Sequence, residues 1–167
     1  MEDILTFTLS PEDSQDGIGT RWLSNFAPSK VILDEIEYPN VEQAYQASKN
    51  NSKQWRSYCA AVKYPQTTKK LAHRDVLIYR ADWDDKLRVK IMRSLLMQKF
   101  SQELYRQRLL LTETAHLEDG NFYGGYFWGT DIKTRKGKNI LGELLMDIRN
   151  ELRKVNEKKR NITEQNF

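Results

Sequence analysis

The sequence contains a single cysteine, Cys59, among its 167 residues. One thiol excludes an internal disulfide, and Cys59 belongs to no CxxC pair, so a thiolate metal site is not expected. No apolar run approaches the ~18 residues that a membrane-spanning helix needs. The acidic start of the chain, residues 1–4, lacks the apolar stretch of a signal peptide. These absences predict a cytoplasmic protein of about one domain's length.

The common catalytic motifs are also absent. The chain has no Walker loop, no GxGxxG, no HExxH and no GxSxG. Its two histidines, His73 and His116, lie in segments that we interpret as helical or peripheral, and we interpret Cys59 as a small core residue. Any catalysis is therefore expected to rest on carboxylates, lysine, amides and aromatic rings.

Positive charge is concentrated near the C-terminal end. Residues 1–130 carry 17 basic and 17 acidic side chains, whereas residues 131–167 carry 10 and 6, so the whole net charge of +4 lies in the second part. Four basic residues crowd one glycine-containing segment: Lys133, Arg135, Lys136 and Lys138. Because this segment precedes a predicted helix, whose N-terminus attracts anions, it favours a phosphate-bearing ligand. A solvated loop is the alternative interpretation.

Periodicity predicts an α+β fold that is predominantly α. Short extended segments are expected at 4–9, 22–26 and 31–38, with a loop at 11–20. Asn40 is a predicted N-cap with Gln43 three residues later, as in a capping box. Six helices are predicted, at 41–50, 54–63, 66–73, 84–99, 101–111 and 139–157. We expect one domain over 1–155 and a basic, frayed tail over 156–167.

Polar residues share one face of the first predicted helix. Glu42, Gln46 and Lys49 are spaced i, i+4 and i+7, which brings their side chains to the same side of an α-helix. This spacing is typical of an exposed charged stripe, and it equally suits a site that needs an acid, an amide and an amine together.

Three glycines surround three aromatic residues at 124–130, in the order Gly-Gly-Tyr-Phe-Trp-Gly-Thr. Such a loop lets backbone approach a ligand closely while an aromatic face stacks on a flat ring. A hydrophobic plug between elements is the alternative.

Four separated motifs resemble those of one family, in unbroken order over roughly residues 20–153. They are WLSNF at 22–26, YPNVEQAYQASK at 38–49, Trp83 with the helix segment 90–100, and FWG followed by GxNxLGxxLM at 127–146. Together they resemble the YbiA-like, or NADAR, family. The chain departs from the family pattern where Gln43 replaces a usual His, Gly125 a usual Asp and Asp119 a usual Glu.

The resemblance implies a compact, mostly helical α+β domain of the YbiA-like type. It also implies an N-glycosidase that cleaves a bond between ribose and a base nitrogen and that requires no metal and no cofactor. Substrates of the family include phosphoribosyl-aminopyrimidine intermediates of riboflavin synthesis and ADP-ribosylated guanine, as a nucleotide or in DNA. The expected partner is therefore a phosphorylated ribosyl compound, and neither a membrane nor a stable nucleic-acid partner is expected.

The site residues are predicted from the positions that correspond to the family motifs and from the chemistry of a ribosyl C–N bond. Glu42, Lys49 and Asp119 are the predicted catalytic residues. The predicted substrate-binding residues, which would hold ribose, base and phosphate, are Asn25, Gln46, Trp83, Trp128, Gly129, Lys133, Arg135, Lys136, Lys138 and Asn139.

Two reaction routes fit these residues. Either a carboxylate activates water at an oxocarbenium-like carbon, or Lys49 captures the anomeric carbon as a Schiff base while Glu42 moves protons. Two other functions remain open. One is a non-catalytic binder of ADP-ribose or a nucleotide; the other is a nucleic-acid-binding domain, which the even charge of residues 1–130 disfavours.

Overall fold

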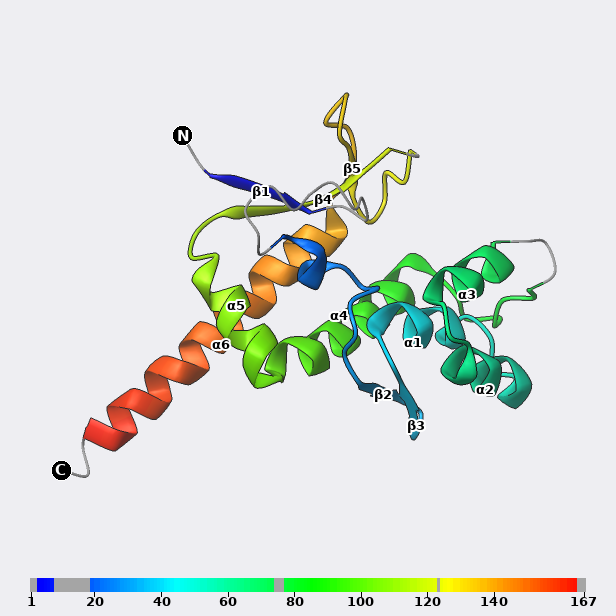
Figure 1. Cartoon of the computed structure of the whole chain (residues 1–167), viewed down its shortest axis with the longest axis horizontal. Helices are drawn as coiled ribbons and strands as arrows, with labels where there is room; N and C mark the ends of the chain where they lie inside the picture. The colour runs from blue at the N-terminus through cyan, green and yellow to red at the C-terminus, as the bar shows by residue number, and fades with distance from the viewer. Residues whose placement is uncertain (1–2, 8–18, 74–76, 123, 165–167) are drawn as a thin grey trace. The chain divides into compact units, whose positions relative to one another are not determined.

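The structure, a computed structural model, describes residues 3–7, 19–73, 77–122 and 124–164, without the side chains of 159, 160 and 162–164. Most of the predicted loop 11–20 lies outside these ranges. The chain forms two units: unit 1 comprises Met1–Trp22 and Phe100–Phe167, and unit 2 comprises Leu23–Lys99. The described residues contain six α-helices and short strands, which confirms the predicted fold class (Figure 1).

Unit 1 is built on a small parallel sheet. Its strands, in spatial order, are β1 (Ile4–Phe7), β4 (His116–Asn121) and β5 (Thr130–Asp131). Helix α6 (Ile140–Glu164) packs on β4, and α5 (Glu103–Leu111) packs on α6. Strand β4 was not predicted, and His116, interpreted as helical or peripheral, opens it. The polar sequence of β4 hides its strand character, which comes from pairing with β1 and β5.

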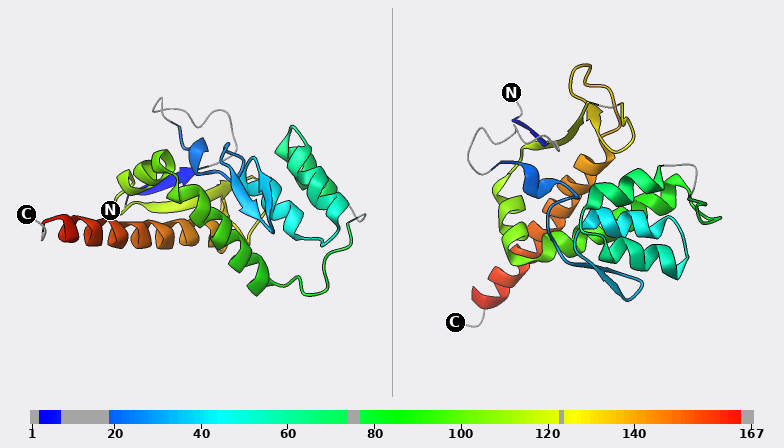
Figure 2. Two further views of the ribbon diagram at one scale, coloured as in Figure 1. Left: turned by 90° about the horizontal axis from the view of Figure 1, so that it is seen from below. Right: turned by 45° about the vertical axis from the view of Figure 1, so that its right-hand side comes forward.

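Helix α6 is longer than predicted. It continues to Glu164, beyond the predicted end at 157, so residues 156–164 of the expected tail are helical. No glycine or proline follows Gly142, and the segment is rich in Glu, Lys and Arg, which favour helix even without an apolar face. The end of α6 projects beyond the strands of unit 1 (Figure 2).

Unit 2 surrounds one short helix. Helix α1 (Val41–Ser48) packs against α2 (Lys53–Ala61), α3 (Pro65–Ala72) and the antiparallel pair β2 (Val31–Leu33) and β3 (Ile36–Tyr38). Helix α4 (Asp85–Ser101) follows, and its last two residues belong to unit 1. Every residue of α1 is buried, so its polar side chains have little contact with solvent.

Two segments predicted as extended are folded back instead. Residues 31–38 form a hairpin because Asp34 and Glu35 adopt positive φ values of 48° and 65°, as a two-residue turn requires. Residues 21–23 form a short 3-10 helix, η1 (Arg21–Leu23), and a turn follows in which Ala27 N–H donates to the Ser24 carbonyl at 3.1 Å. An Asp-Glu turn lacks the glycine that marks most such hairpins, so the sequence pattern missed it.

A lysine lies in the core of unit 2. Lys99, near the end of α4, is 0% exposed, and its Nζ donates to the Ser24 carbonyl at 2.7 Å. Burial lowers the pKa of Lys99 from 10.5 to about 7. Lys99 therefore binds the same Ser24 carbonyl that closes the turn containing Asn25.

Replacing Lys99 by Met should change how stability depends on pH. Between pH 7 and 10 the unfolded chain keeps the Lys99 proton that the folded chain releases, so the free energy of unfolding rises with pH. Urea denaturation should show this rise, up to about 1.4 kcal/mol per pH unit, in wild type relative to Lys99→Met. The exposed control Lys90→Met should retain the wild-type slope, and a Lys99→Met slope equal to wild type would contradict the expectation.

Candidate functional site

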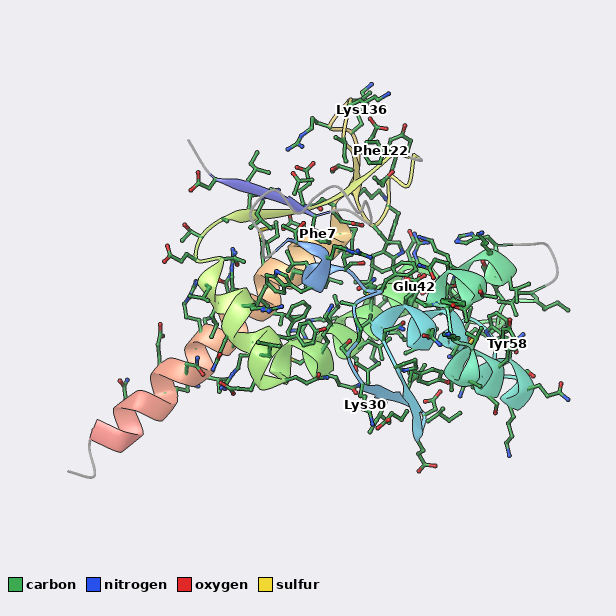
Figure 3. The ribbon with its side chains drawn as sticks, in the orientation of Figure 1. Phe7, Lys30, Glu42, Tyr58, Phe122 and Lys136 are labelled. Atoms are coloured by element: carbon green, nitrogen blue, oxygen red, sulfur yellow. The ribbon has the colours of Figure 1, made fainter. Side chains whose placement is uncertain are left out.

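The predicted polar face of α1 is buried. Glu42, Gln46 and Lys49 are 5%, 2% and 5% exposed. An exposed charged stripe, the structural alternative, is therefore wrong. Figure 3 shows Glu42 on α1, within the side chains of unit 2. Burying a carboxylate and an ammonium costs free energy unless pairing or hydrogen bonds compensate. Solvation at the surface therefore does not explain why these charged residues share this face.

Two buried amide oxygens of unit 2, one of them on this face, lack a hydrogen-bond partner among the described residues. They are Oδ1 of Asn25, which is 8% exposed, and Oε1 of Gln46. Asn25 is joined to α1 because its carbonyl accepts from Glu42 N–H at 3.0 Å, and Gln46 Nε2 donates to Glu42 Oε1 at 2.8 Å. Unpaired buried acceptors cost about 1–3 kcal/mol each. Ribose hydroxyls are donors of the kind that would satisfy them.

Lys49 lies between two aromatic rings. Its Nζ is 5.4 Å from the ring centroid of Tyr45 and 5.5 Å from that of Tyr79. Burial lowers the pKa of Lys49 from 10.5 to about 8, although the charge of Glu42 acts in the opposite direction. Its ammonium makes no hydrogen bond or ion pair with the described residues. A lysine with this pKa has a usable fraction of neutral amine near pH 8, which is what a nucleophile requires.

Trp83 supports this aromatic cluster. Its ring centroid lies 5.8 Å from that of Tyr45 and 6.2 Å from that of Tyr79. Trp83 is half-buried, and its contacts with the two tyrosines fix the rings on which the Lys49 ammonium rests. Tyr45 and Tyr79 were not among the predicted site residues. The spacing of Tyr45, four residues before Lys49, is the signal in the sequence that identifies the first of them.

Gln43, where the family usually has His, has a structural role. Its Nε2 donates to the carbonyls of Cys59 and Val62 at 2.6 and 2.9 Å, and its Oε1 accepts from Asn40 Nδ2 at 2.5 Å. Gln43 thereby ties the start of α1 to the end of α2, and Asn40 is the predicted N-cap, with Oδ1 accepting from Gln43 N–H at 2.9 Å. This departure leaves the face of Glu42 and Lys49 intact.

In unit 1, Asn139 holds strand β4. Its Oδ1 accepts from Asp119 N–H at 3.0 Å and its Nδ2 donates to the Leu117 carbonyl at 2.9 Å. Asn139 is 6% exposed. The geometry of Asn139 therefore favours a role in positioning β4 and Asp119. The sequence had predicted direct contact between Asn139 and the substrate.

Gly129 allows β4 and the following loop to approach closely. A Cβ at this position would lie 2.1 Å from the Asp119 carbonyl oxygen and 2.8 Å from its Oδ2. Only glycine fits there without moving the half-buried Asp119. The glycine in the aromatic loop is thus required by packing against a predicted catalytic carboxylate.

We expect Gly129→Ala to destabilise the protein by about 1–3 kcal/mol, because the added methyl group meets backbone that must shift. Gly125→Ala is the matched control, since its Cβ would meet only Asn121 side-chain atoms at 3.6–3.7 Å. Urea unfolding of both variants measures the difference. Equal stability of the two variants would show that the contact at Gly129 relaxes freely.

A buried carboxylate next to Asp119 was missed. Glu118 is 4% exposed, accepts a hydrogen bond from the Thr130 hydroxyl and forms an ion pair with Arg135. The family pattern predicts a role for Asp119 and none for its neighbour Glu118. A strand of mixed polar residues offers no pattern that would distinguish the two.

The predicted basic segment is an exposed loop after β5 (Lys136 in Figure 3). Asp131 shapes its start, since Oδ1 accepts from Thr134 N–H at 2.7 Å and from Thr134 Oγ1 at 2.9 Å. Arg135 pairs with Glu118, whereas the Lys138 ammonium lies 5.3 Å from the ring centroid of Phe127. The charges of Lys133, Lys136 and Lys138 thus remain exposed to solvent.

The start of α6 is less available to anions than predicted. Leu141 N–H donates to the Trp128 carbonyl at 2.9 Å, and Ile140 N–H donates to the Phe127 carbonyl at 3.4 Å. These bonds occupy amides that a phosphate would use. Trp128 itself is half-buried, with its ring edge-to-face against Phe127 at 5.0 Å between centroids.

The predicted site residues therefore form two groups. Unit 2 holds Asn25, Glu42, Gln46, Lys49 and Trp83, and unit 1 holds Asp119, Trp128, Gly129, Asn139 and the basic loop. Within the described ranges no helix is long and apolar enough to cross a membrane. In that same part of the chain, no three His, Cys, Asp or Glu side chains gather into a metal-binding group.

Comparisons with known proteins agree with the sequence motifs. The profile of the NADAR domain matches residues 11–153. N-glycosidase YbiA of Shigella flexneri serotype 5b is 31% identical over 154 residues, 91% of each chain. Riboflavin biosynthesis protein VVA0006 of Vibrio vulnificus is 30% identical over 132 residues, 78% of this chain and 35% of that protein.

A solved structure shows the same fold. The NMR structure of the Escherichia coli protein YbiA matches with a TM-score of 0.73 and 29% identity, covering 91% of this chain and 86% of that one. The family match spans most of the chain and includes the motifs around Glu42, Trp83 and Trp128. The chain therefore belongs to the NADAR domain family, whose relatives include N-glycosidases.

Proposed function

We propose that this protein is an N-glycosidase that hydrolyses the bond between C1 of a phosphorylated ribose and a base nitrogen. The observation that carries the proposal is the buried face of α1. There a lysine with a pKa of about 8 lies on the same helix face as a buried carboxylate, and this carboxylate's residue is hydrogen-bonded to Asn25 and Gln46, whose side-chain oxygens are unpartnered among the described residues. The names of two relatives, N-glycosidase YbiA and riboflavin biosynthesis protein VVA0006, support this reaction class.

In the lysine route, the neutral Lys49 amine attacks C1 and the C1–N bond to the base breaks. The base departs with a proton that Glu42 relays, and the sugar ring opens to leave a Schiff base on Nζ. Water then hydrolyses the Schiff base, which releases the sugar and regenerates the amine. In the alternative route Glu42 activates water directly and Lys49 acts as a positioning charge.

The oxygens of Asn25 and Gln46 would accept hydrogen bonds from the ribose hydroxyls. This assignment follows from their lack of partners, because a bound donor removes the cost of two buried acceptors. Roles for Asp119, Trp128 and the basic loop stay predictions from the sequence, as does a single domain over 1–155.

A substrate panel tests the proposal. The purified protein is incubated with a phosphoribosyl-aminopyrimidine and with ADP-ribosylated guanine, and release of the free base is followed by chromatography. Turnover of either compound supports the N-glycosidase and identifies the leaving base. Tight binding without base release from both would replace it with a non-catalytic ribosyl-phosphate binder.

A further inference from the structure

A second group of nitrogen side chains lies in unit 2, at the end of α3. Lys69 lies in the last turn of α3, and His73 is the residue that ends this helix. Their spacing of four residues places both side chains on one helix face, and His73 N–H donates to the Lys69 carbonyl at 3.2 Å. Both side chains are exposed, so a ligand can reach them.

This face of α3 adjoins the α1 site. Helix α3 packs directly on α1. The Lys69 ammonium lies 5.4 Å from the ring centroid of Phe26, the residue after Asn25. Burial lowers the pKa of His73, and the charges of Lys49 and then Lys69 lower it further. The imidazole is therefore within electrostatic reach of both ammonium groups.

The group lacks acidic partners among the described residues. Neither Lys69 nor His73 forms an ion pair there, and the nearly buried Lys49 ammonium also has none. The charge of Lys69 disfavours protonation of Lys49, and both ammonium groups disfavour protonation of His73, while Glu42 is the one carboxylate of the described residues that favours the charge on Lys49. An anion would stabilise such an environment. Phosphate, with two charges and several acceptor oxygens, suits such an environment best.

We propose that Lys69 and His73, at the end of α3, bind the phosphate monoester of the ribosyl substrate. This inference rests on the proposed function, and it moves phosphate recognition from the loop at 133–138 to the end of α3. A ribose whose C1 faces Lys49 carries its 5′-phosphate on the other side of the ring. Phosphate held at the rim by Lys69 and His73 would thus orient the reacting carbon within the buried site.

Binding of ribose 5-phosphate tests the proposal without any turnover. Its Kd is measured by calorimetry for wild type, Lys69→Gln, His73→Gln and Lys70→Gln. Loss of a charge-assisted hydrogen bond should weaken ribose 5-phosphate binding about tenfold in each of the first two variants. Lys70 is the exposed neighbour of Lys69, and Lys70→Gln should leave the Kd for ribose 5-phosphate unchanged. Affinity for unphosphorylated ribose should not change in any of them.

Imidazole NMR signals provide a second measurement on wild type. The chain has two histidines, so His116 in unit 1 serves as the internal reference. Ribose 5-phosphate should shift the His73 signals and leave those of His116 in place. Because Lys69 and His73 are exposed, the variants should unfold at wild-type temperatures, which circular dichroism checks.

Either of two results would overturn the proposal: equal Kd values for Lys69→Gln and Lys70→Gln, or the whole loss of affinity in a variant with Lys133, Arg135, Lys136 and Lys138 neutralised. The proposed function fails separately. Normal ribose 5-phosphate binding at Lys69 and His73 with no base release from any ribosyl substrate would reject the N-glycosidase and keep the phosphate site.

Discussion

Replacing Lys49 is expected to lower kcat by about 10²–10⁴-fold, since the side chain either forms the covalent intermediate or holds the charge beside C1. Lys49→Ala removes the amine, but it leaves a cavity because the side chain is 5% exposed. Lys49→Met fills that space and is the better variant. Lys53→Met, at an exposed position, is the matched control.

Trapping and pH dependence separate the two roles of Lys49. If its amine attacks C1, borohydride added during turnover should leave a sugar adduct on Lys49. The activity kcat/KM should then rise with pH until about 8, because only the deprotonated amine is nucleophilic. Lost activity without an adduct would favour the water route, and near-wild-type turnover by Lys49→Met would reject any catalytic role.

Glu42→Gln is expected to reduce kcat by a similar factor. In the wild-type protein Gln46 Nε2 donates to Glu42 Oε1 at 2.8 Å. The glutamine of the variant keeps an oxygen that can accept this bond, so the local hydrogen bonding survives while proton transfer is lost. Measured kcat and KM should show the loss mainly in kcat, as expected for a group that acts in the transition state.

The control for this variant is Glu37→Gln. Glu37 is exposed and pairs with Lys30 on the surface at 2.9 Å, an interaction that contributes little. Its kinetics should match wild type. Because Glu42 raises the pKa of Lys49, Glu42→Gln should also shift the pH profile of residual activity toward lower pH. An unshifted profile with full kcat would show that Glu42 is remote from the reaction.

Local pattern was sufficient for the helices. All six predicted helices are present, and their starts lie within about two residues of the predicted ones. Apolar periodicity and an N-cap such as Asn40 act over a few residues, so they are readable without knowledge of the fold. The same holds for the shared face of Glu42, Gln46 and Lys49, which depends only on helix geometry.

Pairing between strands that are distant in the sequence could not be predicted from local sequence patterns. Strand β4 exists because β1 and β5 lie beside it and Asn139 binds its backbone, partners 10 to 100 or more residues away. The requirement for Gly129 likewise comes from the carbonyl of Asp119. The family motifs predicted that Asn139 and Gly129 belong to the site. They could not show that Asn139 binds the backbone of β4 or that Gly129 packs against Asp119.

By itself, the sequence determined the helical content, the family and the residues that share the α1 face. The tertiary structure decided that this face is buried, that Gln43 is tied to α2, that Arg135 is paired, and that α3, which carries Lys69, packs on α1. The division has a physical reason. Helix formation and capping depend on neighbours along the chain, whereas burial, a lysine pKa of about 8 and a missing hydrogen-bond partner depend on what other elements place around each side chain.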